Sequence, residues 1–492
     1  MLLSHTLVVS LIVGGSAFCL TDEPAERTGI SANELSAFAQ QLTSQGRIIS
    51  DLKIRIVERR TVFDVTAREN PEKLAWLIQV NVPDKQFRES SRRYRADGFQ
   101  NTVHRVIPNG QQKLHSTVWV QKSDGVELLK LPAGPIPATG ELGQQLEPIN
   151  ELLLKTLTDN NIPGGTVCVA RDGVIVCDRG FGYSNLEMKT PMAPDALMRI
   201  ASISKPIIAV AVLLLVEDGK LQLDDQVIDF LSRDQKTKIP DEIDNAWKRL
   251  TVRHLLQHSG GWNRETSKDP MFELVEITRS LKLRKLARVP DIIRYQMSQP
   301  MDFEPGTEYQ YSNFGFCLLG RVIEAASGQS CESFVTKRIL IPAGMNQTRP
   351  GKTKSADRAE HEVHYYTQKL KLFPAIWDVA SVRKSGKFEL VAAPYGQWDL
   401  EVMGAEGAWI STAADLVRFA VALDAPSKPL LKPESLQLMK ARPSFAHPGD
   451  DRWYGLGWNV QSIDSPGRVN LWHNGVFAGS SAILVKRGDQ SA

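Results

Sequence analysis

The 492-residue sequence lacks a strong charge of either sign, because 59 Lys and Arg stand against 56 Asp and Glu and leave a formal net charge of +3. Such a small charge provides no concentrated basic field, so nucleic acid is not an expected partner. Long apolar runs are also lacking after the N-terminus. The densest, 207–216, is far shorter than the roughly 18 residues that span a bilayer. We therefore expect no stable membrane span in the mature chain.

Cysteine is scarce, with five in the whole sequence, and the first of them, Cys19, ends an unusual N-terminal segment. Residues 1–19 contain an apolar stretch followed by small residues, and an acidic segment comes next. This order predicts a secretory signal peptide and hence a secreted or periplasmic protein. Since no Lys or Arg precedes the apolar stretch, membrane tethering by an uncleaved segment stays open.

The four remaining cysteines are candidates for two disulfides in an oxidising compartment: Cys168, Cys177, Cys317 and Cys331. Cys168 and Cys177 lie symmetrically about Asp172-Gly173. A two-residue hairpin there would place them opposite each other, which predicts a Cys168–Cys177 bridge. The alternative is a set of reduced, buried cysteines.

Composition and a Pro- and Gly-rich segment suggest how the chain divides into domains. With 42% hydrophobic and 23% charged residues, it is typical of folded globular proteins, and its length predicts more than one domain. The Pro- and Gly-rich segment 131–143 is predicted to be a linker. Before it, 24–130 is predicted to be a small α+β accessory domain of two helix-strand-strand units, similar to bacterial tandem-repeat modules. After it, 144–492 forms the main domain.

The central chemical signal is Ser202-Ile-Ser-Lys205, directly before an apolar run that is typical of a buried helix. Residues three apart share a helix face, so the Lys205 amine can approach the Ser202 hydroxyl. A serine needs such a neighbouring base to become a nucleophile, and burial of a lysine lowers its pKa. The motif alone is common by chance, so its partners decide the interpretation.

Two further segments supply those partners. Tyr311-Ser-Asn313 follows a turn and precedes a helical pattern, and His473-Asn-Gly475 lies in a strand pattern where glycine permits close approach. His254 and His258 are spaced to share a helix face, but no third ligand is evident, so neither a metal nor another cofactor is expected.

With these three motifs, in this order and spacing, the sequence resembles the class C β-lactamase, penicillin-binding-protein and esterase family over roughly 145–492. The resemblance implies that Ser202 attacks a carbonyl, that Lys205 and Tyr311 move its proton, and that Asn313 binds the substrate amide. It also implies an oxyanion hole made by the backbone amides of Ser202 and Val476.

Two features depart from the β-lactamase pattern. His473 stands where true β-lactamases carry a Lys that meets the substrate carboxylate, so weak β-lactam hydrolysis is expected at best. The family fold also continues into another strand and a C-terminal helix. The sequence therefore predicts a domain over 144–492 without these two elements, and a truncated gene product is one explanation.

The resemblance implies an α/β fold of the β-lactamase/transpeptidase type, in which an antiparallel sheet is flanked by helices and a helical subdomain. The expected protein is a serine hydrolase that acts through an acyl-enzyme on an ester or amide, as an esterase, D-amino-acid peptidase or penicillin-binding-type enzyme. Expected partners are small-molecule or peptide substrates, including cell-wall peptides. The alternative is a catalytically impaired receptor or binding protein for such peptides.

Overall fold

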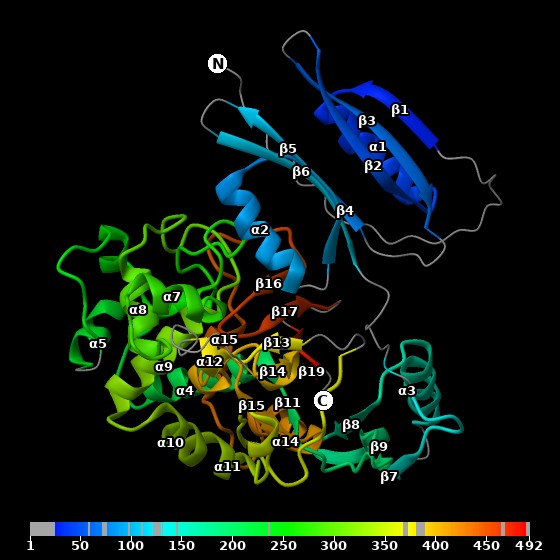
Figure 1. Cartoon of the computed structure of the whole chain (residues 1–492). Coiled ribbons are helices and arrows are strands. Elements are labelled where there is room, and N and C mark those ends of the chain that lie inside the picture. The colour runs from blue at the N-terminus through cyan, green and yellow to red at the C-terminus, as the bar shows by residue number, and fades with distance from the viewer. Residues whose placement is uncertain are drawn as a thin grey trace. The chain divides into compact units, whose positions relative to one another are not determined.

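The computed structural model describes residues 25–57, 60–70, 76–96, 99–109, 112–121, 129, 131–143, 146–234, 237–367, 372–379, 389–463 and 468–488 (Figure 1). The predicted signal peptide, 1–19, lies outside the described residues. The chain divides into two compact units, Met1–Leu128 and Leu129–Ala492. None of the described helices is long and apolar enough to cross a membrane.

The first unit contains two similar α+β motifs, each a strand, a helix and two further strands. Its elements are β1 (Ala25–Ile30), α1 (Ala32–Ser44), β2 (Arg47–Val57), β3 (Arg60–Glu69), β4 (Trp76–Pro83), α2 (Asp84–Ala96), β5 (Phe99–Asn109) and β6 (Gln112–Gln121). The antiparallel sheets have the orders β1-β3-β2 and β4-β6-β5, so the last strand of each motif is central. Ser31 and Glu34 form a capping box at the start of α1.

One apolar core serves both motifs. Leu35 and Leu42 on α1 are fully buried, and they belong to the same cluster as Phe63 on β3 and Val118 on β6. Trp119 is also fully buried, and its indole N–H donates to the side chain of Gln79 at 2.9 Å. This tryptophan therefore stabilises the interior of the unit.

The second unit contains several antiparallel sheets and many helices. Its strands are β7 (Ala138–Leu142), β8 (Gly164–Arg171), β9 (Val174–Asn185), β10 (Thr190–Pro191), β11 (Met198–Arg199), β12 (Arg349–Pro350), β13 (Leu372–Pro374), β14 (Leu390–Ala392), β15 (Trp409–Ser411), β16 (Arg452–Tyr454), β17 (Asn459–Ser462), β18 (Val469–Phe477) and β19 (Ser480–Lys486). Its helices are α3 (Glu147–Asp159), α4 (Ser204–Glu217), α5 (Val227–Arg233), α6 (Val252–Leu256), α7 (Leu274–Ser280), α8 (Val289–Met297), α9 (Asn313–Ser327), α10 (Cys331–Val335), α11 (Ile341–Ala343), α12 (Ile376–Val379), α14 (Ala413–Ala422) and α15 (Pro433–Lys440). The sheet β16-β17-β18-β19 carries the third motif on β18.

Strand β7 shows that the segment predicted as a linker, 131–143, is only partly a linker. Residues 138–142 pair with β9, and a side chain at Gly140 would meet the Asp178 carbonyl oxygen. An edge strand needs main-chain hydrogen bonds rather than apolar periodicity, which is why the sequence pattern missed it.

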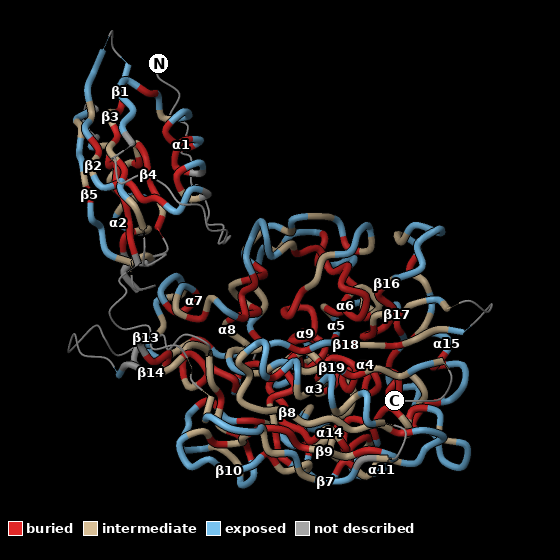
Figure 2. Tube along the Cα trace, turned by 90° about the vertical axis from the view of Figure 1, so that its right-hand side faces the viewer, coloured by how far each residue is buried: buried red, intermediate tan, exposed pale blue. Residues whose placement is uncertain are grey.

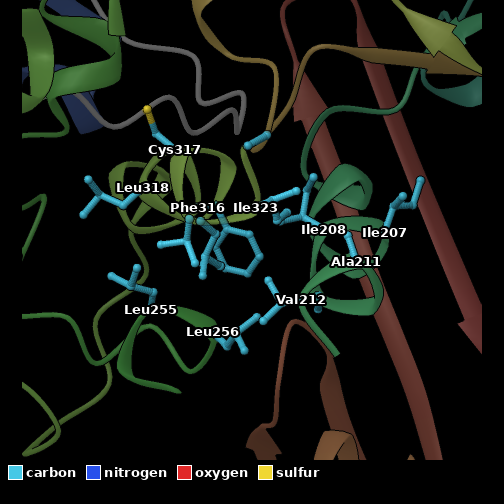
Figure 3. Close-up of a cluster of buried hydrophobic side chains, with 14 of the residues drawn as sticks. Ile207, Ile208, Ala211, Val212, Leu255, Leu256, Phe316, Cys317, Leu318 and Ile323 are labelled. Atoms are coloured by element: carbon cyan, nitrogen blue, oxygen red, sulfur yellow. The ribbon is translucent and has the colours of Figure 1, made fainter. Parts of the chain in front are cut away.

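Helix α4 forms the centre of the core (Figure 2). Its residues from Ile207 to Leu213 are all fully buried, as expected for a helix that is apolar on every side. Ile208 and Val212 face Phe316 on α9 and Leu256 on α6 (Figure 3). Burial of each such side chain stabilises the fold by about 1.5–3 kcal/mol, so the packing fixes the N-terminal end of α4 firmly.

The predicted Cys168–Cys177 bridge is wrong. The turn at Asp172-Gly173 forms as expected, with positive φ at both residues. However, the register shifts after it, so Cys168 lies opposite Asp178 while Cys177 lies opposite Val169. The two thiols therefore point to opposite faces of the hairpin. All four cysteines of the described residues are free: Cys168, Cys177, Cys317 and Cys331.

Candidate active site

Ser202 lies in a short 3₁₀ turn, Ala201–Ile203, that leads into α4. The preceding residue, Ala201, has a φ of +46°, a left-handed conformation that costs a non-glycine residue on the order of 1–3 kcal/mol. The Ser204 hydroxyl donates to the Ala201 carbonyl at 2.7 Å and supports this conformation. Such backbone strain is common at functional sites. It persists only where the surrounding packing holds the backbone in that conformation.

The structure brings Ser202, Lys205 and Tyr311 together. The Tyr311 hydroxyl donates to the Ser202 Oγ at 2.7 Å, and the Lys205 Nζ donates to the same oxygen at 3.0 Å. Lys205 is fully buried, and its Nζ also donates to Asn313 Oδ1 at 2.7 Å and to the Glu406 carbonyl at 2.9 Å. These three acceptors match the three N–H donors of an ammonium group.

Asn313 occupies the first turn of α9, where the Ser312 side chain caps the helix. Its amide Nδ2 donates to Asp269 Oδ2 at 2.8 Å, and its backbone N–H donates to the same oxygen at 3.2 Å. Burial raises the pKa of Asp269, although hydrogen bonds from Met271 and Asn313 oppose that shift. Asp269 thus fixes the orientation of Asn313, which in turn holds Lys205.

His473 is almost completely buried, with 1% of its surface exposed, and it does not line the cavity beside Ser202. Its Nδ1 donates to the Asn474 carbonyl at 2.7 Å, which leaves Nε2 to accept from the Tyr454 hydroxyl at 3.0 Å. Burial, with Lys205 nearby, lowers the pKa of His473 to about 3. The imidazole is therefore neutral, and both of its nitrogens are already occupied.

Gly475 and Val476 lie where β18 passes the start of α4. A Cβ at Gly475 would come within 2.0 Å of the Ile200 carbonyl oxygen and 3.0 Å of the Ser202 nitrogen, so only glycine fits. Pairing of β17 with β18 ends at Trp472, and Asn474, Val476 and Phe477, which follow on β18, line the cavity. Val476 lines the cavity and is 66% exposed.

The cavity at Ser202 has a volume of about 610 Å³, which is large enough for a small organic or peptide substrate. Its wall combines polar and apolar side chains. The lining residues are Ala201, Ser202, Arg264, Glu265, Met271, Phe272, Tyr309, Gln310, Tyr311, Asn313, Met403, Glu406, Gly407, Asn474, Val476 and Phe477. Among the described residues, no group of three His, Cys, Asp or Glu side chains is placed to hold a metal ion.

Two residues of this site belong to none of the three sequence motifs. Asp269 and Glu406 both lie outside the three motifs, in turns that precede short elements. An acidic residue in a turn is ordinarily exposed, so only the folded chain reveals that these two are buried beside Asn313 and Lys205.

A serine that shares hydrogen bonds with a buried lysine and a tyrosine, at the start of a core helix, defines a serine hydrolase of the acyl-transfer class. The chain belongs to the Beta-lactamase family, whose model matches residues 149–489. This finding confirms the resemblance, the α/β fold and the class of enzyme.

The names of similar proteins in the family indicate different activities. The chain is 31% identical over 342 residues to penicillin-binding protein 4* of Bacillus subtilis (strain 168), which covers 68% of each chain. It is 34% identical over 194 residues to esterase EstB of Burkholderia gladioli, covering 39% of this chain and 48% of that one. The match thus spans about two thirds of the first relative and half of the second.

Solved structures show the same fold. The octameric penicillin-binding protein homologue from Pyrococcus abyssi matches with a TM-score of 0.53 and 23% identity, over 70% of this chain and 72% of that one. A D-stereospecific amidohydrolase from Streptomyces sp. matches with a TM-score of 0.50 and 25% identity, over 69% and 91%.

Proposed function

We propose that the protein hydrolyses a carboxylic ester or amide through an acyl-enzyme on Ser202. The observation that carries this proposal is the pair of hydrogen bonds at the Ser202 Oγ, 2.7 Å from the Tyr311 hydroxyl and 3.0 Å from the Lys205 Nζ. Both distances lie within the reach of direct proton transfer. These contacts support a proposal in which the Ser202 hydroxyl exchanges protons directly with Tyr311 and Lys205.

The proposed reaction consists of two acyl transfers, first to Ser202 and then to water. Ser202 Oγ forms a bond to the substrate carbonyl carbon while its proton passes to the Tyr311 and Lys205 pair, one member of which must first have lost its own proton. The bond to the leaving alcohol or amine then breaks, and that group receives the proton. Water attacks the acyl-enzyme in the second half and restores Ser202. The backbone amides of Ser202 and Val476 are the proposed donors to the carbonyl oxygen, as electrostatic stabilisation of the developing charge requires.

Esters and D-amino-acid amides are the proposed substrates, with weak hydrolysis of β-lactams. His473 supports this preference, because its buried, neutral ring gives the third motif no positive charge for a substrate carboxylate. An esterase and a D-stereospecific amidohydrolase among the similar proteins agree with such substrates.

A second candidate, release of a C-terminal amino acid from a peptide such as a cell-wall peptide, is favoured by Arg264. Among the described residues that line the cavity, Arg264 supplies the one positive charge, 5.5 Å above the Tyr311 ring. Its carboxylate neighbour Glu265 is 3.7 Å away and exposed, which makes a weak pair. Because Arg264 lies beside Tyr311, its guanidinium is suited to pair with a carboxylate on the leaving group.

The decisive experiment is steady-state hydrolysis of a p-nitrophenyl ester, nitrocefin and a D-alanyl p-nitroanilide, each beside Ser202→Ala. Turnover of the ester or anilide that disappears in Ser202→Ala supports the enzyme, and nitrocefin turnover equal to the others contradicts the substrate preference. No turnover by a folded chain favours the impaired peptide-binding protein instead.

Arg264→Gln separates the two candidates. For a peptide with a free C-terminal carboxylate, the variant should lower kcat/KM about tenfold, while the same peptide with an amidated C-terminus should be hydrolysed unchanged. An equal effect on both peptides rules out recognition of the carboxylate by Arg264.

Export from the cell is the proposed localisation, supported by the N-terminal sequence. The mass of the protein recovered outside the cytoplasm should correspond to a chain that starts near residue 20. A full-length mass in the cytoplasm would contradict export.

A further inference from the structure

Glu406 is a buried acid directly behind Lys205. It lies in the turn before β15, with 3% of its surface exposed, and its backbone carbonyl accepts from the Lys205 Nζ at 2.9 Å. Both carboxyl oxygens are buried, and within the described part of the chain no side chain donates a hydrogen bond to them. The backbone N–H groups of Ala405 and Glu406 lie near enough to lower the pKa of this carboxyl, although neither makes a well-formed hydrogen bond. The catalytic steps above give this carboxyl no role.

Glu406 lines two cavities. One is the cavity at Ser202, and the other has a volume of about 320 Å³ and is lined by Cys317, Cys331 and Glu401, among others. Glu406 therefore borders both cavities, although its carboxyl oxygens are themselves buried.

The charged and titratable groups that face Glu406 come from several elements. Lys205 on α4 is the positive neighbour, and Asp269, before α7, is a negative one. The thiols of Cys317 on α9 and Cys331 on α10 also lie within electrostatic range. Burial raises the pKa of Glu406 to about 8, while Lys205 acts in the opposite direction. The carboxyl is therefore protonated at neutral pH and ionises just above it.

The charge of this carboxyl changes the field that Lys205 exerts. While Glu406 is neutral, the Lys205 ammonium favours negative charge on the Ser202 oxygen, to which it donates at 3.0 Å. The ammonium also lies 5.0 Å from the centre of the Tyr311 ring. Once Glu406 is ionised, a carboxylate within electrostatic range of the ammonium offsets that effect. An opposite charge within about 4–6 Å shifts a pKa by roughly 1–3 units, which is enough to change a proton-transfer rate tenfold or more.

We infer that Glu406 is a positioning residue for the proposed hydrolysis, whose protonated carboxyl keeps Lys205 effective toward Ser202 and whose ionisation slows formation of the acyl-enzyme. The inference rests on the proposed function, because it concerns the step that Ser202 and Lys205 carry out. It adds a pH control that acts through Lys205, because the carboxyl oxygens are buried and not exposed to the cavity.

The test is the pH profile of kcat/KM for a p-nitrophenyl ester between pH 6.5 and 9.5, with Ser202→Ala subtracted as background. The ratio of Glu406→Gln to the unchanged enzyme should rise about tenfold over this range, because the amide cannot ionise. A ratio that stays constant overturns the inference.

Glu332→Gln is the matched control, since Glu332 is an exposed carboxylate that lines the second cavity only. It should leave the profile unchanged. A tenfold rise in this variant too would assign the effect to general surface charge and contradict the role of Glu406.

A second measurement keeps the inference testable if Glu406→Gln does not fold. In Ser202→Ala, infrared difference spectra should show a protonated carboxyl band that disappears with a midpoint near pH 8, as the pKa of Glu406 requires. No carboxyl that titrates between pH 7 and 9 overturns the inference. Absence of any Ser202-dependent turnover instead contradicts the proposed function, whereas turnover with an unchanged pH profile contradicts Glu406 alone.

Discussion

Gly475 passes so close to Ile200 that a Cβ on the glycine would lie 2.0 Å from the Ile200 carbonyl oxygen. The contact joins β18, which carries the third motif, to the turn that carries Ser202. It therefore sets the distance between the nucleophile and the strand edge that supplies Val476. Backbone packed against backbone cannot move aside for a methyl group as a flexible side chain could.

Gly475→Ala should lower kcat/KM at least 100-fold and destabilise the protein by about 1–3 kcal/mol, because the strand must shift away from Ser202. Ester hydrolysis and urea unfolding measure the two effects. Gly404→Ala is the control, since nothing lies within 4 Å of its added Cβ. Equal losses in both variants would show that the close approach at Gly475 is unimportant.

Ser202→Ala should abolish labelling by a fluorophosphonate probe, because the probe reacts with an activated serine only. Ser298→Ala should keep the label, since Ser298 is an exposed serine whose hydroxyl bonds to the Tyr295 carbonyl and has no part in the site. Intact-mass spectrometry reads both. Label retained in Ser202→Ala would place the nucleophile elsewhere.

Asp269→Asn should reduce kcat about 10- to 100-fold while KM changes little. Asp269 Oδ2 accepts two hydrogen bonds from Asn313, and Oδ1 accepts one from the Met271 backbone. An asparagine must replace one of these acceptors by an NH₂ donor, which leaves a buried donor facing a donor. Steady-state kinetics with the ester tests this expectation, and a normal kcat would separate Asp269 from the positioning of Asn313.

The structure brings together three residues that the sequence proposed for the catalytic centre, Ser202, Lys205 and Tyr311. Ser202 and Lys205 are three residues apart, and that local spacing places them together wherever the chain turns into a helix. Tyr311 lies 109 residues from Ser202 and was found through its motif, not through any local pattern. Asp269 and Glu406 were missed because burial of an acid depends on distant segments that fold over it.

The hairpin at Cys168 shows a different limit. Its turn was predicted correctly from Asp172-Gly173, because both residues tolerate positive φ. One extra residue in a strand then moved Cys177 to the other face, and no feature of composition marks such a bulge. Similarly, β7 pairs by its main chain, so its sequence looked like a linker.

Alkylation of the unfolded chain without prior reduction should label all four cysteines from Cys168 to Cys331, because the structure holds them as free thiols. In the folded chain labelling should be slow, since burial raises the pKa of Cys168 to about 12 and that of Cys331 to about 12. Intact-mass spectrometry counts the added groups. A shortfall of two that appears only before reduction would reveal a bridge.

Stability should fall below pH 6.5 in a way that depends on His473. The pKa of this residue is about 3 in the folded chain because of burial, against 6.5 for an ordinary histidine. Above pH 6.5 both the folded and unfolded chains hold it neutral, so there is no cost. As the pH falls toward 3, only the unfolded chain takes up the proton, which favours unfolding by on the order of 1 kcal/mol per pH unit.

His473→Gln removes this titration, so the free energy of unfolding of the unchanged protein should decrease relative to the variant between pH 6.5 and 4.5. Urea unfolding at each pH measures the difference. His447→Gln, at a histidine whose side chain is 79% exposed, should show no such trend. Parallel curves for the unchanged protein and His473→Gln would mean that His473 takes up its proton in the folded state. A cation would then stand at the third motif, and the proposed preference against β-lactams would lose its physical basis.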